Sequence, residues 1–262
     1  MKRLFYLLLP TLGVAAFFAC KKQTTLVAVT SPVGTNAFIK IVHASPNFIT
    51  LYKVPTDSLN VYVGSEKVTA TALHFGGGFP SPTSGNILGY ATAPSGQQTI
   101  RVSATGVTTK DSITVASFTE NLAPGGYYTF VITDSVNSTR DSSRIFVRDT
   151  YTASPAGPGY FYIRFIHGVV AGADTVDLYD PRRNQTLFSK IRKDSTTTFT
   201  NFPTTLGLPD TLYVRQSSTG TVLAKLNTYQ FGDQQSFTAY YIGDTAVVKP
   251  TKPRTLTVLE NK

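Results

Sequence analysis

Apolar and polar residues alternate with a period of two along most of the chain beyond residue 37. In "SLNVYVG", for example, Leu59, Val61 and Val63 alternate with polar or small residues. This is the pattern of a strand that buries one face. Thr, Val, Tyr and Phe dominate such segments and Pro and Gly separate them, whereas a 3.6-residue period is not evident beyond the N-terminal apolar run. The pattern predicts an all-β protein.

Five of these segments recur in the same order later in the chain. "IKIVHA" matches "YIRFIHG", "SLNVYVG" matches "TVDLYDP", "TIRVSATG" matches "TLYVRQSSTG", "LAPGGYYTFVITDS" matches "FGDQQSFTAYYIGD", and "RIFVRDT" matches "RTLTVLEN". Ordered internal similarity indicates a duplicated unit. We therefore predict two tandem antiparallel immunoglobulin-like β-sandwich domains, residues 38–151 and 160–262, joined by the linker "TASPAGPG".

The N-terminus has the features of a lipoprotein signal peptide over residues 1–19. Lys2 and Arg3 precede an apolar run that ends at Phe18. Cys20 follows "AFFA", which resembles a bacterial lipobox, in which this cysteine is acylated and becomes the mature N-terminus. Residues 20–37 then form a flexible tether. The alternatives are an uncleaved membrane anchor and an ordinary secretory signal with an incidental thiol.

Charge and cysteine content narrow the set of partners. The formal net charge is +9, and removal of residues 1–19, which hold Lys2, Arg3 and no acidic residue, leaves +7. The basic residues look scattered, so no nucleic-acid partner is expected, although anionic lipids or polyanions could be attracted. Cys20 is the single cysteine, and once it is acylated no thiol remains for a disulfide, a metal site or a nucleophile.

The first repeat resembles a known family in its "VHASP", "LNVYV" and "PGGYYTFVI" strands. Together with the doubled layout after a lipobox, these segments are similar to the bacterial secreted proteins that carry a DUF4397 domain, common in Bacteroidetes lipoproteins. In the second repeat "HGVV" replaces "HASP" and "FGDQQ" replaces "APGG". The family is defined by sequence and not by a demonstrated activity. The resemblance therefore implies a β fold and an envelope location far more than a mechanism.

Two of the three histidines occupy matching positions. His43 lies on the same strand face as Ile39 and Ile41, and His167 falls on the corresponding face of the second repeat. A neutral imidazole there can donate and accept a hydrogen bond at the end of a core, so we assign both histidines a structural role. The alternative is metal binding, but neither segment supplies a second ligand at suitable spacing. We predict no metal and no cofactor.

The sequence offers no pattern typical of an enzyme. "GGG" at residues 76–78 is not followed by the Gly-Lys-Ser/Thr of a phosphate-binding loop, and the "GxSxG", "HExxH" and "DxDxDG" motifs are missing. Asp177 and Asp180 are close in sequence, but Asp180 precedes "PRR" as a turn residue would, and Asp177 alternates outward with Tyr179. We therefore predict that the protein has no catalytic residues.

Aromatic residues provide the main argument for binding. Tyr62, Tyr179, Tyr213 and Tyr240 fall on strand faces opposite the predicted cores, and Phe75 and Phe79 flank "GGG" in a predicted long loop that ends near Asn86. The alternatives are cross-strand packing of the tyrosines and an ordinary mobile connection.

These observations predict a non-enzymatic envelope lipoprotein that acts as a binding or structural module. Its partners would be the membrane, through lipid on Cys20, and an envelope protein in interaction or adhesion. The alternative is capture of polysaccharide for an outer-membrane uptake system. The location would be the outer membrane. The "KKQTT" segment after Cys20 lacks acidic residues such as those of a Bacteroidetes surface-export signal, which favours the periplasmic face over the cell surface.

Overall fold

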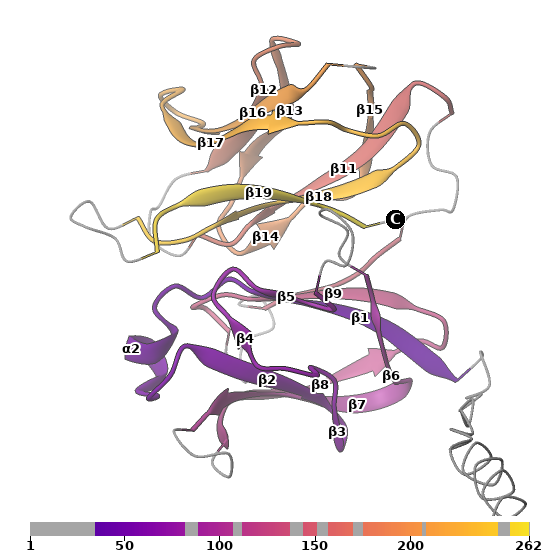
Figure 1. The fold of residues 1–262 in the computed structure, drawn as a ribbon, viewed down its shortest axis with the longest axis vertical. Helices are drawn as coiled ribbons and strands as arrows, with labels where there is room; N and C mark the ends of the chain where they lie inside the picture. The colour runs from indigo at the N-terminus through magenta and orange to yellow at the C-terminus, as the bar shows by residue number, and fades with distance from the viewer. Residues whose placement is uncertain are drawn as a thin grey trace, which may run out of the picture. The chain divides into compact units, whose positions relative to one another are not determined.

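The computed structural model describes residues 35–81, 89–106, 112–136, 144–150, 157–169, 175–205, 208–245 and 252–261. The predicted signal peptide and most of the predicted tether lie outside these residues. Residues 32–262 form one compact unit, which is built almost entirely of β-strands (Figure 1). The prediction of an all-β fold is therefore confirmed.

Two sheets, A and B, are formed by the part of the chain up to residue 150, which we call the first half. Sheet A has the order β10 (Ile145–Arg148), β9 (Tyr127–Ile132), β1 (Asn36–His43) and β5 (Gly78–Phe79), with β6 (Ala91–Pro94) also paired to β1. Sheet B has the order β3 (Glu66–Lys67), β2 (Ser58–Val63), β7 (Gly96–Thr105) and β8 (Ser112–Leu122), with β4 (Leu73–His74) also paired to β2.

Sheets C and D are formed by the part of the chain from Tyr160 onward, the second half. Sheet C has the order β14 (Ser195–Thr196), β11 (Tyr160–His167), β18 (Ser236–Ile242) and β19 (Thr255–Glu260), with β15 (Thr200–Pro203) also paired to β11. Sheet D has the order β13 (Gln185–Ile191), β12 (Val176–Asp180), β16 (Asp210–Gln216) and β17 (Val222–Tyr229).

The two halves follow the same pairing order. The segments matched in sequence form β1 and β11, β2 and β12, β7 and β16, β9 and β18, and β10 and β19. In each half the first strand pairs in parallel with a later strand, β1 with β9 and β11 with β18, whereas the other pairs between named strands are antiparallel. Parallel pairing is possible because the intervening chain crosses to the other sheet and returns.

The parallel register defines equivalent residues. Lys40 lies beside Thr129, and Arg164 lies beside Thr238. In the antiparallel pairs that follow, Val147 lies beside Thr129 and Leu259 beside Thr238. Counting two residues onward makes Asp149 the equivalent of Asn261.

Each half has its own apolar core between its two sheets. Ile39, Ile41 and Leu59 are fully buried in the first core, and Ile163, Phe165 and Leu178 are fully buried in the second. These are the inward positions that the period-two pattern predicts. The strands are positioned by this burial, because each buried side chain of this size contributes roughly 1.5–3 kcal/mol.

Two local features complete the fold. A short helix, α2 (Phe48–Tyr52), follows β1 and was not predicted; it buries Phe48 in the first core. The "PGG" turn before β9 needs glycine, because Gly125 has φ +69° and a side chain on Gly126 would approach the Ala123 carbonyl oxygen to 2.9 Å. The Gly125 N–H donates to the Asn36 carbonyl at 2.8 Å, which ties this turn to the start of β1.

Candidate functional site

Sheets A and C pack face to face through the sides that point away from the two cores. A third apolar cluster contains Val42, Val131 and Ile145 from sheet A with Ile166, Tyr240 and Ile242 from sheet C. Sheet A therefore has two buried faces, and so does sheet C. The period-two pattern had placed these second faces in solvent.

Polar residues lie in the same interface and bond across it. Lys40 and Arg164 are equivalent residues on β1 and β11, and both are buried. The Lys40 ammonium donates to Asn261 Oδ1 at 2.6 Å, and the Arg164 guanidinium bonds to Asp149 Oδ1 and donates to Thr129 Oγ1 at 2.7 Å. Each cation thus reaches an acceptor in the other half.

Hydroxyl groups and aromatic rings complete this network. Tyr90 Oη and Thr129 Oγ1 donate to Asp149 Oδ2 at 2.6 and 2.7 Å. Lys40 Nζ lies 4.0 Å from the centre of the Tyr90 ring, and Arg164 lies 4.6 Å from that of Phe199. Tyr90 and Phe199 hold equivalent places, directly before β6 and β15. The same cation–aromatic pair therefore occurs in both halves.

Burial shifts the pKa of two groups in this interface. Burial lowers the pKa of Lys40 to about 7, Asp149 opposes the shift, and Arg164 adds to it. Burial also raises the pKa of Tyr240 to about 12. Sequence reasoning missed Lys40, Asp149, Arg164 and Asn261. The available signal was the equivalence of Lys40 and Arg164 between two apolar neighbours in each strand.

His43 is fully buried, and its ring joins a second set of contacts between the halves. Nδ1 accepts from the Ser45 N–H at 3.3 Å, and Nε2 lies 3.3 Å from Asp57 Oδ1. Lys252, from the second half, pairs with the other oxygen of Asp57. Burial lowers the pKa of His43, and the nearby carboxylate of Asp57 opposes that shift.

His167 has different partners at the equivalent position. Its Nδ1–H donates to the Ile191 carbonyl at 3.2 Å, and its ring packs against Tyr241 with 5.3 Å between centroids. Burial lowers the pKa of His167 as well. The two imidazoles therefore use Nδ1 in opposite ways, as acceptor in His43 and as donor in His167. Asp57, which approaches His43, is the residue that the sequence did not indicate.

Three of the four predicted tyrosines lie on the outer faces of sheets B and D. Tyr62, Tyr179 and Tyr213 are half-buried, and each has a cation over its ring. Arg101 lies 3.9 Å from the Tyr62 ring centre, Arg215 lies 3.4 Å from that of Tyr179, and Lys225 Nζ lies 5.2 Å from that of Tyr213.

The other aromatic predictions need correction. Tyr240 is 1% exposed, because its strand face is covered by sheet A. Phe75 is half-buried against the A–C cluster and Phe79 against the first core, since part of the predicted loop forms β4 and β5. The rest of that loop, residues 82–88, lies outside the described residues.

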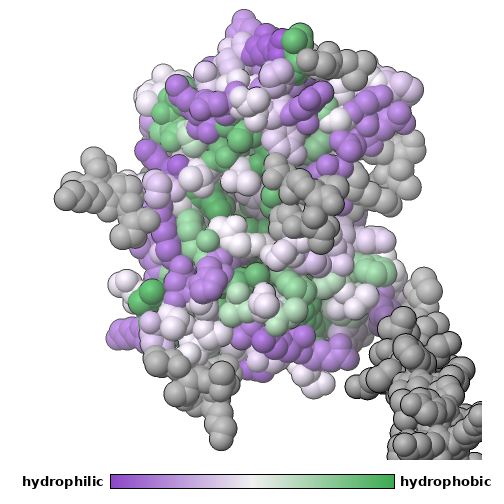
Figure 2. All heavy atoms as spheres, viewed as in Figure 1, coloured by the Kyte–Doolittle hydropathy of each residue, from purple (hydrophilic) through white to green (hydrophobic). Residues whose placement is uncertain are grey.

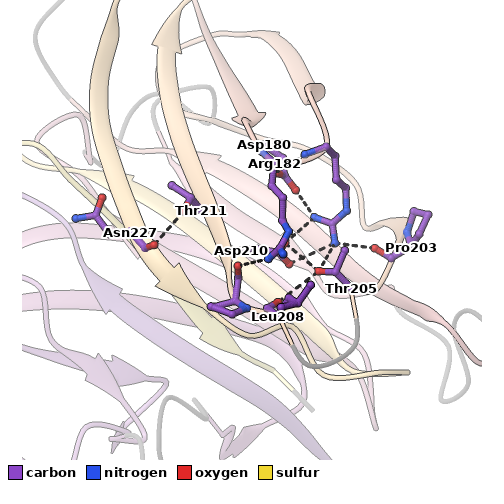
Figure 3. Close-up of polar contacts among 10 residues, drawn as sticks. Asp180, Arg182, Pro203, Thr205, Leu208, Asp210, Thr211 and Asn227 are labelled. Atoms are coloured by element: carbon purple, nitrogen blue, oxygen red, sulfur yellow. Dashed lines mark hydrogen bonds and ion pairs between the residues drawn. The ribbon is translucent and has the colours of Figure 1, made fainter.

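A buried carboxylate pair lies at one end of the second half. Polar contacts of Asp180, Asp210 and Thr205 meet at this end of the second half (Figure 3). Arg183 pairs with both carboxylates, and Thr205 Oγ1 donates to Asp210 Oδ1 at 3.0 Å. Burial raises the pKa of Asp210, and Arg183 opposes the shift.

Asp180 also closes the turn after β12. Its Oδ1 accepts from the backbone N–H groups of Arg182 and Arg183 at 2.9 and 3.2 Å. This is the turn-forming contact that the sequence predicts for Asp180. The Arg183 guanidinium lies between Asp180 and Asp210. The two carboxylates therefore do not face each other across an open cleft, as those of a glycosidase do.

Within the described part of the chain, no group of three His, Cys, Asp or Glu side chains is arranged to hold a metal ion. Among the same residues, no helix has the length and apolar character needed to cross a membrane.

The fold and contacts define an all-β protein of paired sandwiches whose buried polar groups join its two halves. The chain belongs to the family described as domain of unknown function DUF4397, whose model matches residues 37–179. This confirms the resemblance found in the sequence. No curated protein matches the chain.

Several solved structures show distant similarity. A candidate polysaccharide-binding protein (DUF1812) from Bacteroides thetaiotaomicron has 10% identity over 80% of this chain and 92% of its own, with a TM-score of 0.22. The fimbrial anchor protein Mfa2 from Porphyromonas gingivalis has 11% identity over 87% and 100%, with a TM-score of 0.24. A candidate adhesin from Bacteroides ovatus has 9% identity over 80% and 89%, with a TM-score of 0.20. TM-scores this low carry no inference about function.

Proposed function

We propose that this protein is a non-enzymatic binding or structural module of the cell envelope, anchored by lipid on Cys20. The observation that carries the proposal is the use of its buried charged groups. Lys40, Asp149 and Arg164 are buried between sheets A and C and bond to one another or to neutral side chains there. A catalytic acid or base must reach a substrate proton, and groups enclosed in this way cannot.

The division into repeats 38–151 and 160–262 is part of the proposal. The A–C interface would hold the two repeats as one body, so that the outer faces of sheets B and D are the surfaces offered to a partner. The partner would be an envelope protein, in interaction or adhesion.

The alternative is capture of a polysaccharide. The cations over Tyr62 and Tyr179 bear on this choice, because a neutral sugar stacks on an open aromatic face, and here one face of each ring is covered. The pattern supports a charged partner of either kind.

Fractionation and protease shaving test the anchor and its orientation. The wild-type chain should fractionate with the outer membrane, and Cys20→Ala should move it to the soluble periplasmic fraction. On intact cells, added protease should leave the wild-type chain uncut until lysis, with a known periplasmic protein as the lysis control. Digestion of the chain on unbroken cells would show that it lies at the cell surface. Retention of the Cys20→Ala chain in the membrane would refute the lipid anchor.

Crosslinking and turnover assays test the binding role. Photo-crosslinkers placed at Tyr62 and Tyr213 should capture envelope partners in living cells, while a crosslinker at the buried Tyr240 should capture none. Purified protein should show no turnover on a panel of esters and glycosides. Turnover that disappears in His43→Ala or His167→Ala would overturn the non-enzymatic assignment.

A further inference from the structure

The two halves differ in charge. Residues 36–151 contain eight lysines and arginines against seven aspartates and glutamates, whereas residues 160–262 contain twelve against eight. The excess positive charge of the folded part therefore lies mainly in the second half. The basic residues are not evenly scattered in the second half, contrary to the expectation from the sequence. The segment "KIRKD" places Lys190, Arg192 and Lys193 within four positions.

The outer face of sheet D gathers several of these cations. Tyr179 lies directly opposite Tyr213, which in turn lies opposite Lys225 on the next strand. Arg215 projects from the same face and stacks on Tyr179. Residues directly opposite on neighbouring strands have Cβ atoms about 4.5–5.5 Å apart, so these side chains form one continuous patch.

The edge strand β13 extends this patch. Lys190, Arg192 and Lys193 are exposed where β13 ends. The Lys190 N–H donates to Asp177 Oδ1 at 2.8 Å, and Asp177 lies directly opposite Arg215. Asp177 is an acidic residue within this face, and its Oδ1 also accepts from Ser217 Oγ at 2.6 Å. We call Lys190, Arg215 and Lys225, with Tyr179 and Tyr213, the sheet D cationic face; Arg192 and Lys193 lie beyond β13, in the connection to β14 of sheet C.

Most neighbours of these cations are polar, but Val222, which lies directly opposite Arg215, is 39% exposed. Thr186 and Asn227 are exposed on the neighbouring strands and offer hydrogen bonds beside the charges. Figure 2 shows hydrophilic side chains interspersed with hydrophobic ones over the end of the second half that sheet D forms. A lipid surface would require apolar or aromatic groups that insert between headgroups, whereas this face presents rings already stacked with cations.

The stacked arginine indicates the chemistry of the ligand. The ring of Tyr179 holds Arg215 as a flat, pre-oriented guanidinium, which reduces the entropy lost when it binds a planar carboxylate through two hydrogen bonds. The additional cations on both sides suit a polymer with repeated negative charges. Polar neighbours suit its hydroxyl groups.

We propose that the sheet D cationic face binds an acidic polysaccharide that carries carboxylate groups. This inference rests on the proposed binding function and specifies its polysaccharide alternative. The outer face of sheet B stacks Arg101 on Tyr62 and places Lys67 directly opposite Tyr62, and it serves as the internal comparison.

The experiment is calorimetric titration of the full chain, purified in a neutral detergent, with polygalacturonate in the presence of a chelator. Wild type should bind at low salt and release the polymer as salt rises, since exposed charge pairs are screened. Uncharged dextran should not bind. The double variant Arg215→Gln/Lys225→Gln should bind about tenfold more weakly, because it loses charge-assisted hydrogen bonds. The matched control Lys67→Gln/Arg101→Gln should bind like wild type, and unchanged thermal midpoints should show that both variants fold.

Other outcomes would overturn the inference in distinct ways. Absence of polygalacturonate binding, or an equal loss in both variants, would exclude a specific site on sheet D. Equally tight binding to polyglutamate would make carboxylate charge alone the determinant, and stronger binding to phosphatidylglycerol vesicles would point to lipid headgroups. In each case partners captured by in-cell crosslinking would still support the proposed function, so the two failures remain distinguishable.

Discussion

The two halves meet through equivalent residues that carry different chemistry. Arg164 reaches across the interface to Asp149, whereas its equivalent, Lys40, reaches across to Asn261, the equivalent of Asp149. The partner at each position follows from the acid–base chemistry of the cation. A guanidinium stays protonated under any ordinary condition and needs a buried counter-charge, whereas a buried amine can release its proton. One carboxylate, Asp149, and one amide, Asn261, are therefore sufficient as buried partners for Arg164 and Lys40.

The largest effect is expected where the permanent charge is paired. Asp149→Ala leaves Arg164 buried without its counter-charge and removes the acceptor of Tyr90 and Thr129. Loss of one partner of a buried pair costs about 3–5 kcal/mol, so urea unfolding should show a decrease of this size. Asp149→Leu/Arg164→Met should regain most of it, since no charge stays unpaired. A decrease below about 1 kcal/mol would show that the pair acts as a surface salt bridge does.

The second prediction concerns the pH dependence of Lys40. Its pKa in the folded chain is about 7, against an ordinary value of 10.5. Between these values the unfolded chain binds the proton and the folded chain does not, so this group makes stability rise with pH. The stability of Lys40→Met minus that of wild type should therefore be greatest near pH 7 and decrease by roughly 3 kcal/mol toward pH 10, since each pKa unit corresponds to 1.36 kcal/mol.

Urea unfolding of both proteins at a series of pH values measures this difference. Lys53→Met, a change in an exposed lysine at the end of α2, is the control and should give a constant difference. A constant difference for Lys40→Met as well would mean that Lys40 stays charged throughout the range.

The third prediction compares the two histidines. His43→Ala and His167→Ala should each destabilise the fold by about 1–3 kcal/mol through lost packing and hydrogen bonds. The larger loss is expected for His43, because its imidazole also approaches Asp57. Neither change should alter metal content, measured by mass spectrometry of the purified chain. Zinc or copper present in wild type and lost in a variant would contradict the structural role.

Acid sensitivity provides a further readout for the same variants. Burial lowers the pKa of both imidazoles, so the unfolded chain binds more protons as pH falls below 6.5. Wild-type stability should decrease in that window, and each alanine variant should lose part of the decrease. An unchanged acid profile in a variant would show that its histidine takes up a proton over the same pH range in the folded and the unfolded chain.

The sequence was sufficient for the strands and insufficient for the interface. The alternation in "SLNVYVG" and the matched segments predicted the inward faces and the equivalence of the halves. Alternation cannot tell whether an outward position meets water or a second sheet, so the pattern predicted an open face for Tyr240. The useful signal was the near-continuous apolar run around Val131 and Tyr240, which is typical of strands buried on both faces. Asp57 could not be predicted, because it lies in a connection whose path no periodicity determines.

The smallest change in stability is expected for a substitution at position 261. Asn261→Asp places a carboxylate where the first half already has one, 2.6 Å from Lys40 Nζ in the present contact. The new charge should hold the proton on Lys40 and raise its pKa, although burying the carboxylate costs part of the gain. The net change in stability at pH 8 should therefore stay within about 1 kcal/mol, since the two terms oppose each other.

The informative measurement for Asn261→Asp is how its stability changes with pH. If charge at position 261 decides the protonation of Lys40, the rise in stability between pH 7 and 10 should be weaker in Asn261→Asp than in wild type, and Asn261→Leu should keep the wild-type slope while losing the hydrogen bond. Identical slopes in wild type and Asn261→Asp would mean that burial alone fixes the state of Lys40. The difference between acid and amide at these two equivalent positions would then have no electrostatic role.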